Sequence, residues 1–214
     1  MAAAQDYFDL YDYRQRVFLM YKKRNSLLQQ GASHAAILKE FREEKDELFA
    51  SHPQSALDND QRTKFKGLSY FPYSKDLVFE AEVIEIPPRA VTVPKNPYEA
   101  MTMTSIAQVT FAIAGQPATL SIYWIDVYGG GLFLPFHDGT SPDISYGAGR
   151  YLFDTIKGSS FLESTRNGKN TIILDFNYAY NPSCAYNPLW VCPLAPVENR
   201  ITPRIEAGEK KFEL

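Results

Sequence analysis

The spacing of hydrophobic residues changes near residue 68, and this change constrains the fold more than any other feature of the chain. Before that point, apolar residues recur every three or four positions, the spacing of one face of an α-helix. After it, residues 78–86 alternate apolar and acidic side chains over their central part, as in a strand with one face toward water. The sequence therefore predicts an α+β fold in which helices precede a β-rich region.

Two helices are predicted in the first part of the chain. The first spans about residues 5–30 and ends at Gly31, and Ser33 is the predicted N-cap of the second. The second ends at His52-Pro53, because a residue before proline disfavours the helical conformation. We expect residues 1–56 to form a helical arm and residues 57–214 a β-rich domain, together making one structural unit.

About eight strands are predicted after the helices, joined by short loops that favour antiparallel pairing. Residues 114–117 should form a hairpin turn, whereas Pro87-Pro88 should turn the chain between two separate strands. The predicted strands cover residues 78–86, 90–93, 105–113, 118–125, 130–136, 150–155, 171–176 and 201–205. An antiparallel β-barrel or β-sandwich with two N-terminal helices follows from this pattern.

The charge balance argues against some partners. The chain has 22 Lys and Arg against 25 Asp and Glu, a net charge of −3, so no overall positive field attracts nucleic acid or an anionic membrane. No segment approaches the roughly 18 apolar residues of a membrane-spanning helix. The N-terminus also lacks the basic-then-apolar pattern of an export signal. We therefore expect a soluble cytoplasmic protein.

The cysteines and histidines offer little for a metal site. Two cysteines are too few for a disulfide framework, and the spacing of Cys184 and Cys192 differs from the Cys-x-x-Cys of redox motifs. No histidine pairs closely with a cysteine, so zinc is not expected, and the sequence indicates no particular cofactor. Each cysteine is interpreted first as a small buried hydrophobic residue. The alternative is that Cys184 acts as a nucleophile with His137 as its base.

Two glycine-rich turns lead into charged residues. His137 and Asp138 follow one turn at a strand end, but neighbours on a strand point to opposite faces, so they are weak acid–base candidates. Arg150 enters a strand from the other turn, and a buried arginine needs an anionic ligand or a carboxylate as its partner. The carboxylates that could form a structural ion pair with it are Asp138, Asp154 and Asp175.

Residues 175–194 contain both cysteines, several aromatic residues and two Asn-Pro turns. That much proline is incompatible with a regular helix or strand, so the segment should be irregular and rigid. Proteins often place binding sites on such segments. Its tyrosines either cover the core or line a cavity. The candidate ligand-binding residues from this segment and the preceding strand are Arg150, Tyr151, Tyr180 and Asn181.

Several long motifs resemble those of one family. They lie at Lys45-Asp46-Glu47-Leu48-Phe49 and at residues 65–72, 131–141, 146–151, 175–186, 192–194, 198–199 and 207–209. With these motifs the chain resembles a bacterial and archaeal family catalogued as domain of unknown function 1684, over most of its length. It departs from the family in having His137 where the pattern is usually basic, often arginine, which weakens any mechanism that needs His137. Its N-terminal helix is also longer than the family core requires. The resemblance supplies no activity.

Two functions are compatible with a site around Arg150. The first is a module that binds a small molecule, in a pocket containing Arg150 and at least one residue of the group Tyr151, Tyr180 and Asn181. The second is a hydrolase or lyase that acts on a small anionic substrate and uses Arg150 as an anion clamp. Its acid–base group would be Asp138 or His137, and its donor or nucleophile Tyr180 or Cys184.

A third function does not need a pocket. The first predicted helix is rich in tyrosine, with Tyr7, Tyr11, Tyr13 and Tyr21, and tyrosine is enriched at protein interfaces. We therefore also expect that the chain could pair with a second copy of itself through its N-terminal helices.

Overall fold

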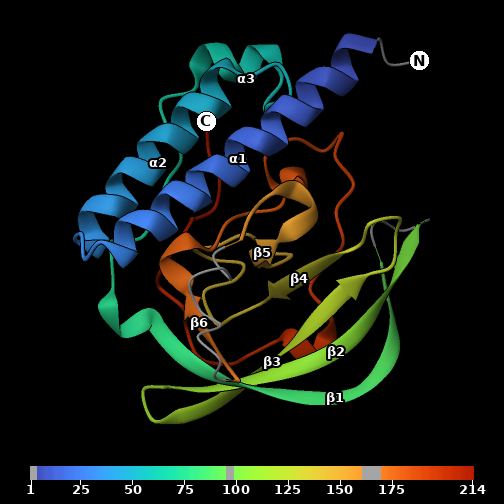
Figure 1. Cartoon of the computed structure of the whole chain (residues 1–214). Helices are drawn as coiled ribbons and strands as arrows, with labels where there is room; N and C mark the ends of the chain where they lie inside the picture. The colour runs from blue at the N-terminus through green and yellow to red at the C-terminus, as the bar shows by residue number, and fades with distance from the viewer. Residues whose placement is uncertain (1–3, 95–98, 161–169) are drawn as a thin grey trace.

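The computed structural model describes residues 4–94, 99–160 and 170–214 (Figure 1). Within these ranges the chain forms three α-helices and six β-strands, with short 3-10 turns between the later elements. The helices are α1 (Ala4–Gln29), α2 (His34–Ser51) and α3 (Asn59–Lys64). The strands are β1 (Val78–Pro94), β2 (Ala100–Ile113), β3 (Gln116–Ile125), β4 (Gly131–Phe136), β5 (Arg150–Asp154) and β6 (Thr171–Asp175). The predicted α+β class is confirmed.

The strands form one antiparallel sheet in the order β5-β4-β3-β2-β1-β6. The sheet curls into a half-barrel, with the helices on one side of it (Figure 1). The described part of the chain thus has six strands rather than about eight. Residues 201–205 form no strand, although neighbouring Arg200 makes an isolated bridge with His137.

Pro87-Pro88 does not separate two strands, as predicted, but lies inside β1. The pairing of β1 with β2 shifts register between Glu85 and Arg89, which marks a bulge at the two prolines. A bulge leaves residues unpaired, so the N–H group that proline lacks is not needed there. The strand therefore continues through a sequence that normally ends one.

The hairpin between β2 and β3 agrees with the prediction. Ile113 pairs with Gln116, and the two residues between them, Ala114 and Gly115, have φ angles of 49° and 77°. Two left-handed residues in a two-residue loop match the twist of the flanking strands.

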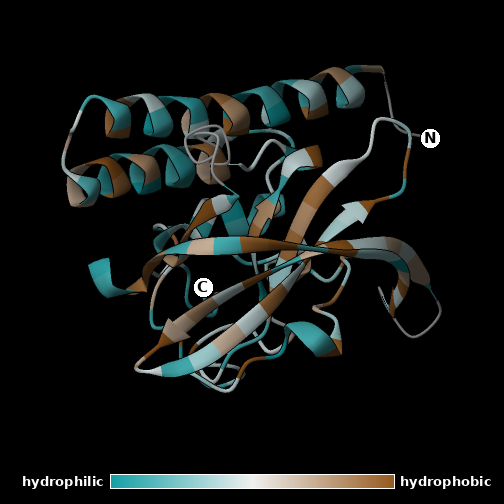
Figure 2. Ribbon diagram, turned by 60° about the horizontal axis from the view of Figure 1, so that its bottom comes forward, coloured by the Kyte–Doolittle hydropathy of each residue, from teal (hydrophilic) through white to brown (hydrophobic). Residues whose placement is uncertain are grey.

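The helices and the sheet share one hydrophobic core. Its cluster of buried residues includes Met20 and Tyr21 of α1, Phe41 of α2 and Leu120 of β3. Hydrophobic and hydrophilic residues alternate along several strands, so that one face of the curled sheet packs inward (Figure 2). The segments predicted as arm and domain therefore pack on each other.

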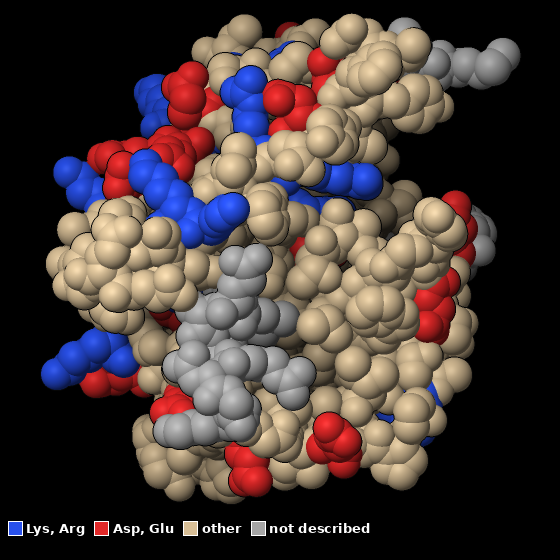
Figure 3. All heavy atoms as spheres, viewed as in Figure 1, with Lys and Arg blue, Asp and Glu red and all other residues tan. Residues whose placement is uncertain are grey.

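Ion pairs connect the helices to each other and to the sheet. On the face shown in Figure 3, side chains of both charges lie together over α1 and α2, where Lys23 contacts Glu40 and Glu44. These exposed pairs contribute little to stability. The pair of Arg24 with Asp175 is different, because its 3.0 Å contact joins α1 to the end of β6 and both side chains are buried. It fixes the position of α1 against the sheet edge.

Helix α3 was not predicted, although its sequence carries a start signal. The side chain of Asp58 accepts a hydrogen bond from the backbone N–H of Gln61, and the Gln61 side chain accepts one from the backbone N–H of Asp58. This reciprocal arrangement is a capping box, which satisfies two N–H groups at the start of a helix. None of the described helices combines the length and apolar character needed to cross a bilayer.

Candidate functional site

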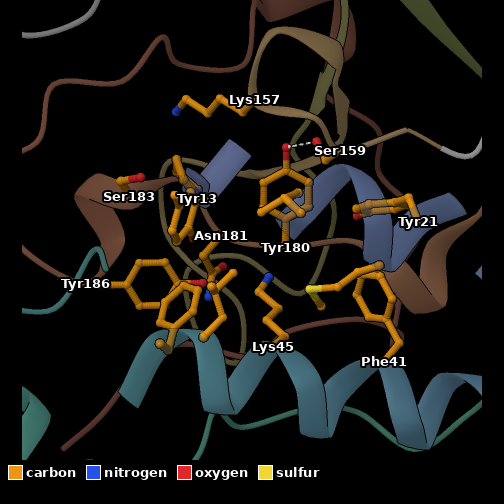
Figure 4. Close-up of a pocket in the computed structure, with 15 residues that line it drawn as sticks. Tyr13, Tyr21, Phe41, Lys45, Lys157, Ser159, Tyr180, Asn181, Ser183 and Tyr186 are labelled. Carbon is orange, nitrogen blue, oxygen red and sulfur yellow. Dashed lines mark hydrogen bonds between the residues drawn. The ribbon is translucent and has the colours of Figure 1, made fainter. Parts of the chain in front are cut away.

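A cavity of about 80 Å³ lies between α1, α2 and the irregular segment that follows β6. Its lining is mostly aromatic and aliphatic, with a few polar groups (Figure 4). The lining residues are Tyr13, Val17, Met20, Tyr21, Phe41, Lys45, Leu48, Phe49, Lys157, Ser159, Tyr180, Asn181, Pro182, Ser183 and Tyr186. An apolar cavity with a few convergent polar groups is the usual form of a small-molecule site.

Glu209 joins three residues of this lining through its buried carboxylate. One carboxylate oxygen accepts from the ammonium group of Lys45. The other accepts from the hydroxyl of Tyr186 and, at 2.8 Å, from the backbone N–H of Asn181. Because Lys45 comes from α2 and Glu209 from the C-terminal end of the chain, this network joins the helical pair to the last segment of the fold.

Gly208 allows Glu209 to reach this position. It has a φ of +76°, and a Cβ placed on it would lie 2.4 Å from the carbonyl oxygen of Ala179. Only glycine tolerates both this conformation and this close approach. The backbone N–H of Glu209 then donates to the same carbonyl oxygen at 2.9 Å, which holds the two segments together.

Asn181 presents an acceptor without a partner. Its side-chain amide donates to the carbonyl oxygen of Lys210 at 2.8 Å, but its Oδ1 atom finds no hydrogen-bond partner among the described residues. The residue is only 3% exposed. Leaving a buried acceptor unpaired costs about 1 to 3 kcal/mol. Because Asn181 lines the cavity, this unpaired acceptor belongs to a residue of the cavity wall.

Lys45 and the tyrosines form the aromatic part of the wall. Lys45 rises from α2 toward Tyr180 (Figure 4), and its Nζ lies 4.9 Å from the Tyr180 ring centroid and 5.6 Å from that of Phe49. The Tyr180 hydroxyl shares a 2.6 Å hydrogen bond with Ser159 Oγ. Burial raises the pKa of Tyr180 and of Tyr186 well above the usual range, so both phenols stay neutral.

The structure separates the four predicted ligand-binding residues into two pairs. Tyr180 and Asn181 line the cavity, whereas Arg150 and Tyr151 do not. The hydroxyl of Tyr151 donates to the carbonyl oxygen of Pro193 at 2.5 Å, and its ring packs edge-on against Tyr180. Tyr151 therefore packs against Tyr180 without lining the cavity itself.

Arg150 is engaged by protein groups. Its Nη2 atom donates to Asp138 Oδ1 at 2.9 Å and to the carbonyl oxygen of Ile205 at 2.8 Å. Its Nη1 atom donates to the carbonyl oxygens of Ala207 and Glu209. The side chain is fully buried. Of the two interpretations offered by the sequence, the structure favours the ion pair with Asp138, and the arginine binds the C-terminal segment to β5.

The three weak catalytic candidates do not meet in the cavity. Asp138 is saturated, because it also accepts from Thr140 and from the backbone N–H of Ile205. His137 pairs through its backbone, and burial lowers the pKa of its ring. Cys184 contacts Cys192 and Tyr146. No group of three or more metal-ligating side chains occurs in the described ranges.

Lys45 and Glu209 were missed as site residues. Both lie in motifs that carry the family resemblance, and membership of these motifs was the feature of the sequence that could have identified them. They are 164 residues apart in the sequence, so their pairing depends on the tertiary fold. Lys157 and Ser159 were missed as well, because the short turn after β5 has no sequence pattern typical of a site.

A second, larger hollow of about 400 Å³ lies along the curled sheet. Its lining is chiefly aliphatic and includes Val83, Ile106, Leu132 and Ile172. It offers fewer polar groups to orient a ligand than the cavity beside α2.

Comparisons with known proteins agree with the fold. A family model described as "Protein of unknown function (DUF1684)" matches residues 63–210. The solution NMR structure of an uncharacterized protein of Haloarcula marismortui is similar over 81% of this chain and 91% of that protein, with 32% identity and a TM-score of 0.60. A search of curated proteins finds no match.

Proposed function

Because the chain belongs to the DUF1684 family, whose function is unknown, we propose its function from its own geometry: it binds a compact small molecule in the cavity beside α2. The unpartnered, buried Oδ1 atom of Asn181 carries this proposal. A ligand that donates a hydrogen bond to this atom removes the cost of leaving it unpaired. The half-barrel and the two long helices serve as the rigid scaffold of the site.

The polar end of the ligand is defined by Asn181 and Lys45. These residues bind opposite oxygens of the Glu209 carboxylate, so they are neighbours at one end of the cavity. Asn181 offers an acceptor, and the Lys45 ammonium has donors beyond the one that Glu209 receives. A hydroxyl or carboxamide group matches this pair, because each can donate and accept.

A neutral polar end fits better than an anionic one. Glu209 already compensates the charge of Lys45, and Arg150 is engaged by Asp138 and backbone carbonyls. A carboxylate on the ligand would lie near the Glu209 carboxylate in a poorly solvated place, where like charges repel strongly. We therefore favour an alcohol or an amide over the anion that the sequence suggested.

The body of the ligand is compact and apolar. At about 10–15 Å³ for each water molecule, the cavity has room for roughly five to eight water molecules. Its walls carry aromatic rings from α1, α2 and the segment after β6. A single aromatic or aliphatic group of similar size would fill it.

Ligand-observed NMR with four single-ring probes tests this proposal. Benzyl alcohol and benzamide should bind, while benzoate and toluene should bind at least tenfold more weakly. Asn181→Leu should remove the preference for the alcohol and the amide. Val17→Phe should abolish binding, because Val17 lines the cavity from α1.

Val127→Phe is the matched control, since Val127 is exposed and lies outside the lining. It should bind the probes as the unaltered chain does. The proposal is wrong if no probe binds, or if Val17→Phe binds them all as well as Val127→Phe does.

A hydrolase or lyase receives less support from the geometry. Of the residues that were expected to share the chemistry, Tyr180 lines the cavity, but Arg150, His137, Asp138 and Cys184 lie outside its lining. A binding function needs only the lining and its unpaired acceptor.

Pairing of two copies of the chain through α1 is a second candidate function. Tyr7, Phe8 and Tyr11 are more than 60% exposed, and their spacing of three and four residues places them on one helical face. Sedimentation velocity should show a dimer for the unaltered chain and a monomer for Phe8→Glu. Identical monomeric behaviour of both proteins would reject this candidate.

A further inference from the structure

Cys184 and Cys192 meet at the end of the irregular C-terminal segment. Both are free thiols, and Cys184 is partly exposed. The backbone N–H of Cys184 donates to Cys192 Sγ at 3.4 Å. The Tyr146 hydroxyl donates to Cys184 Sγ at 3.7 Å. The seven residues between them thus fold back and bring the Cys184 backbone against the Cys192 sulfur atom.

The surroundings of the two sulfurs favour different protonation states. Contact with Cys184 lowers the pKa of Cys192 below its usual value, aided by the charge of Lys157 and the backbone N–H groups of Cys184 and Ser183, while burial opposes this shift. The same contact raises the pKa of Cys184, as does its burial. Cys192 is therefore the cysteine of the pair that loses its proton more readily, and the thiolate is the reactive form of cysteine.

We propose that Cys192 and Cys184 form a peroxide-sensitive dithiol that closes into a disulfide. The Cys192 thiolate attacks one oxygen of a hydroperoxide, the O–O bond breaks, and the departing hydroxide or alkoxide takes up a proton. Cys192 becomes a sulfenic acid. Cys184 then loses its proton and attacks Cys192 Sγ, the S–O bond breaks, and hydroxide leaves as water. The two cysteines together lose two electrons, which reduce one peroxide.

The position of the pair suits a small oxidant. Cys192 is 3% exposed, yet Leu189, three residues before it, is 84% exposed. The covering chain is therefore at the molecular surface, where local opening costs least. Hydrogen peroxide is small enough to enter through such an opening. Cys184, as the partly exposed neighbour, is placed to resolve the sulfenic acid.

Thiol counting with hydrogen peroxide on the reduced full chain tests the proposal. One equivalent of peroxide should convert two free thiols into none, with the loss of two hydrogen atoms in the intact mass. Peptide mapping should find a disulfide between Cys184 and Cys192. The rate of thiol loss should rise with pH and be half-maximal clearly below the usual pKa of a cysteine, following the Cys192 thiolate.

Two variants assign the roles. Cys184→Ser should stop at a sulfenic acid on Cys192, which dimedone labels. Cys192→Ser should react at least tenfold more slowly. The pH profile of the unaltered chain needs no variant, so it decides the question even if a variant fails to fold. Unchanged thiol counts, a midpoint near pH 9, or dimedone on Cys184 instead of Cys192 would overturn the proposal.

Discussion

Asp138 and Arg150 show at the scale of single residues how a buried charge pair can resemble a site in the sequence. Both are almost fully buried, and the 2.9 Å contact between them links the turn after β4 to the start of β5. Asp138→Asn should destabilise the fold by about 3 to 5 kcal/mol, because it leaves the Arg150 charge buried and uncompensated. Urea denaturation measures this difference.

The control for that change is Glu206→Gln, which breaks the exposed pair of Arg204 with Glu206. Exposed pairs are worth about 0 to 1 kcal/mol, so the effect should be small. Equal effects of the two substitutions would show that the Asp138 pair does not hold the C-terminal segment in place.

His137 gives the fold a dependence on pH. Burial lowers the pKa of its ring below the usual 6.5 in the folded state, with a further contribution from Arg200. The unfolded chain therefore binds a proton more readily, and stability is lost as the pH falls through about 6.5 toward the folded-state value. His137→Gln should reduce the slope of unfolding free energy against pH between 6.5 and 5. An unchanged slope would exclude His137 as its source.

At the scale of elements, the position of Glu209 depends on one glycine. Gly208 and Gly31 share a left-handed φ, +76° and +77°, but a Cβ at Gly208 would collide with Ala179 whereas one at Gly31 meets nothing within 4 Å. Gly31→Ala should therefore cost only the conformational strain, about 1 to 2 kcal/mol. Gly208→Ala should cost clearly more and should weaken benzamide binding as well, since it displaces Glu209. Thermal unfolding and NMR titration of both variants provide the measurements, and equal effects would contradict this role of Gly208.

The elements also show what the sequence could predict. Hydrophobic spacing was sufficient for α1, α2 and most strands, because each pattern reflects local geometry and burial of one face. It failed at Pro87-Pro88, where pairing with β2 overrides a local turn signal through a bulge. It also failed at residues 201–205, which form no strand. Their apolar residues pack without joining a ladder: Ile205 is buried, and its carbonyl accepts from Arg150.

The candidate site was also predictable only in part, because some of its contacts form only in the tertiary fold. Tyr180 and Asn181 were identified because a proline-rich segment must be irregular, and irregular segments often carry sites. Lys45 could not be assigned to the same place, since its contact with Glu209 arises only when α2 packs against the end of the chain. Arg150 was predicted to bind a ligand because a buried arginine needs a partner for its charge. In the structure its guanidinium group binds Asp138 and backbone carbonyl oxygens instead.

For the whole molecule, α1 is part of the core rather than an appendage. Met20 and Tyr21 belong to the main hydrophobic cluster, and Arg24 pairs with Asp175. A chain beginning at residue 32 should therefore fail to fold cooperatively, while one beginning at residue 10 should keep its thermal transition within a few degrees. Circular dichroism during heating distinguishes them. A cooperative transition in the shorter chain would mean that the β-rich part is an independent domain.

The central claim is that the cavity beside α2 holds a small neutral ligand, and amide chemical-shift mapping with benzamide tests it most directly. We predict saturable shifts centred on the backbone amides of Ser159, Asn181 and Ser183, and their loss in Val17→Phe but not in Val127→Phe. The absence of shifts at millimolar benzamide, or shifts centred on Val83, Ile106 and Leu132 in the hollow of the sheet, would contradict the claim.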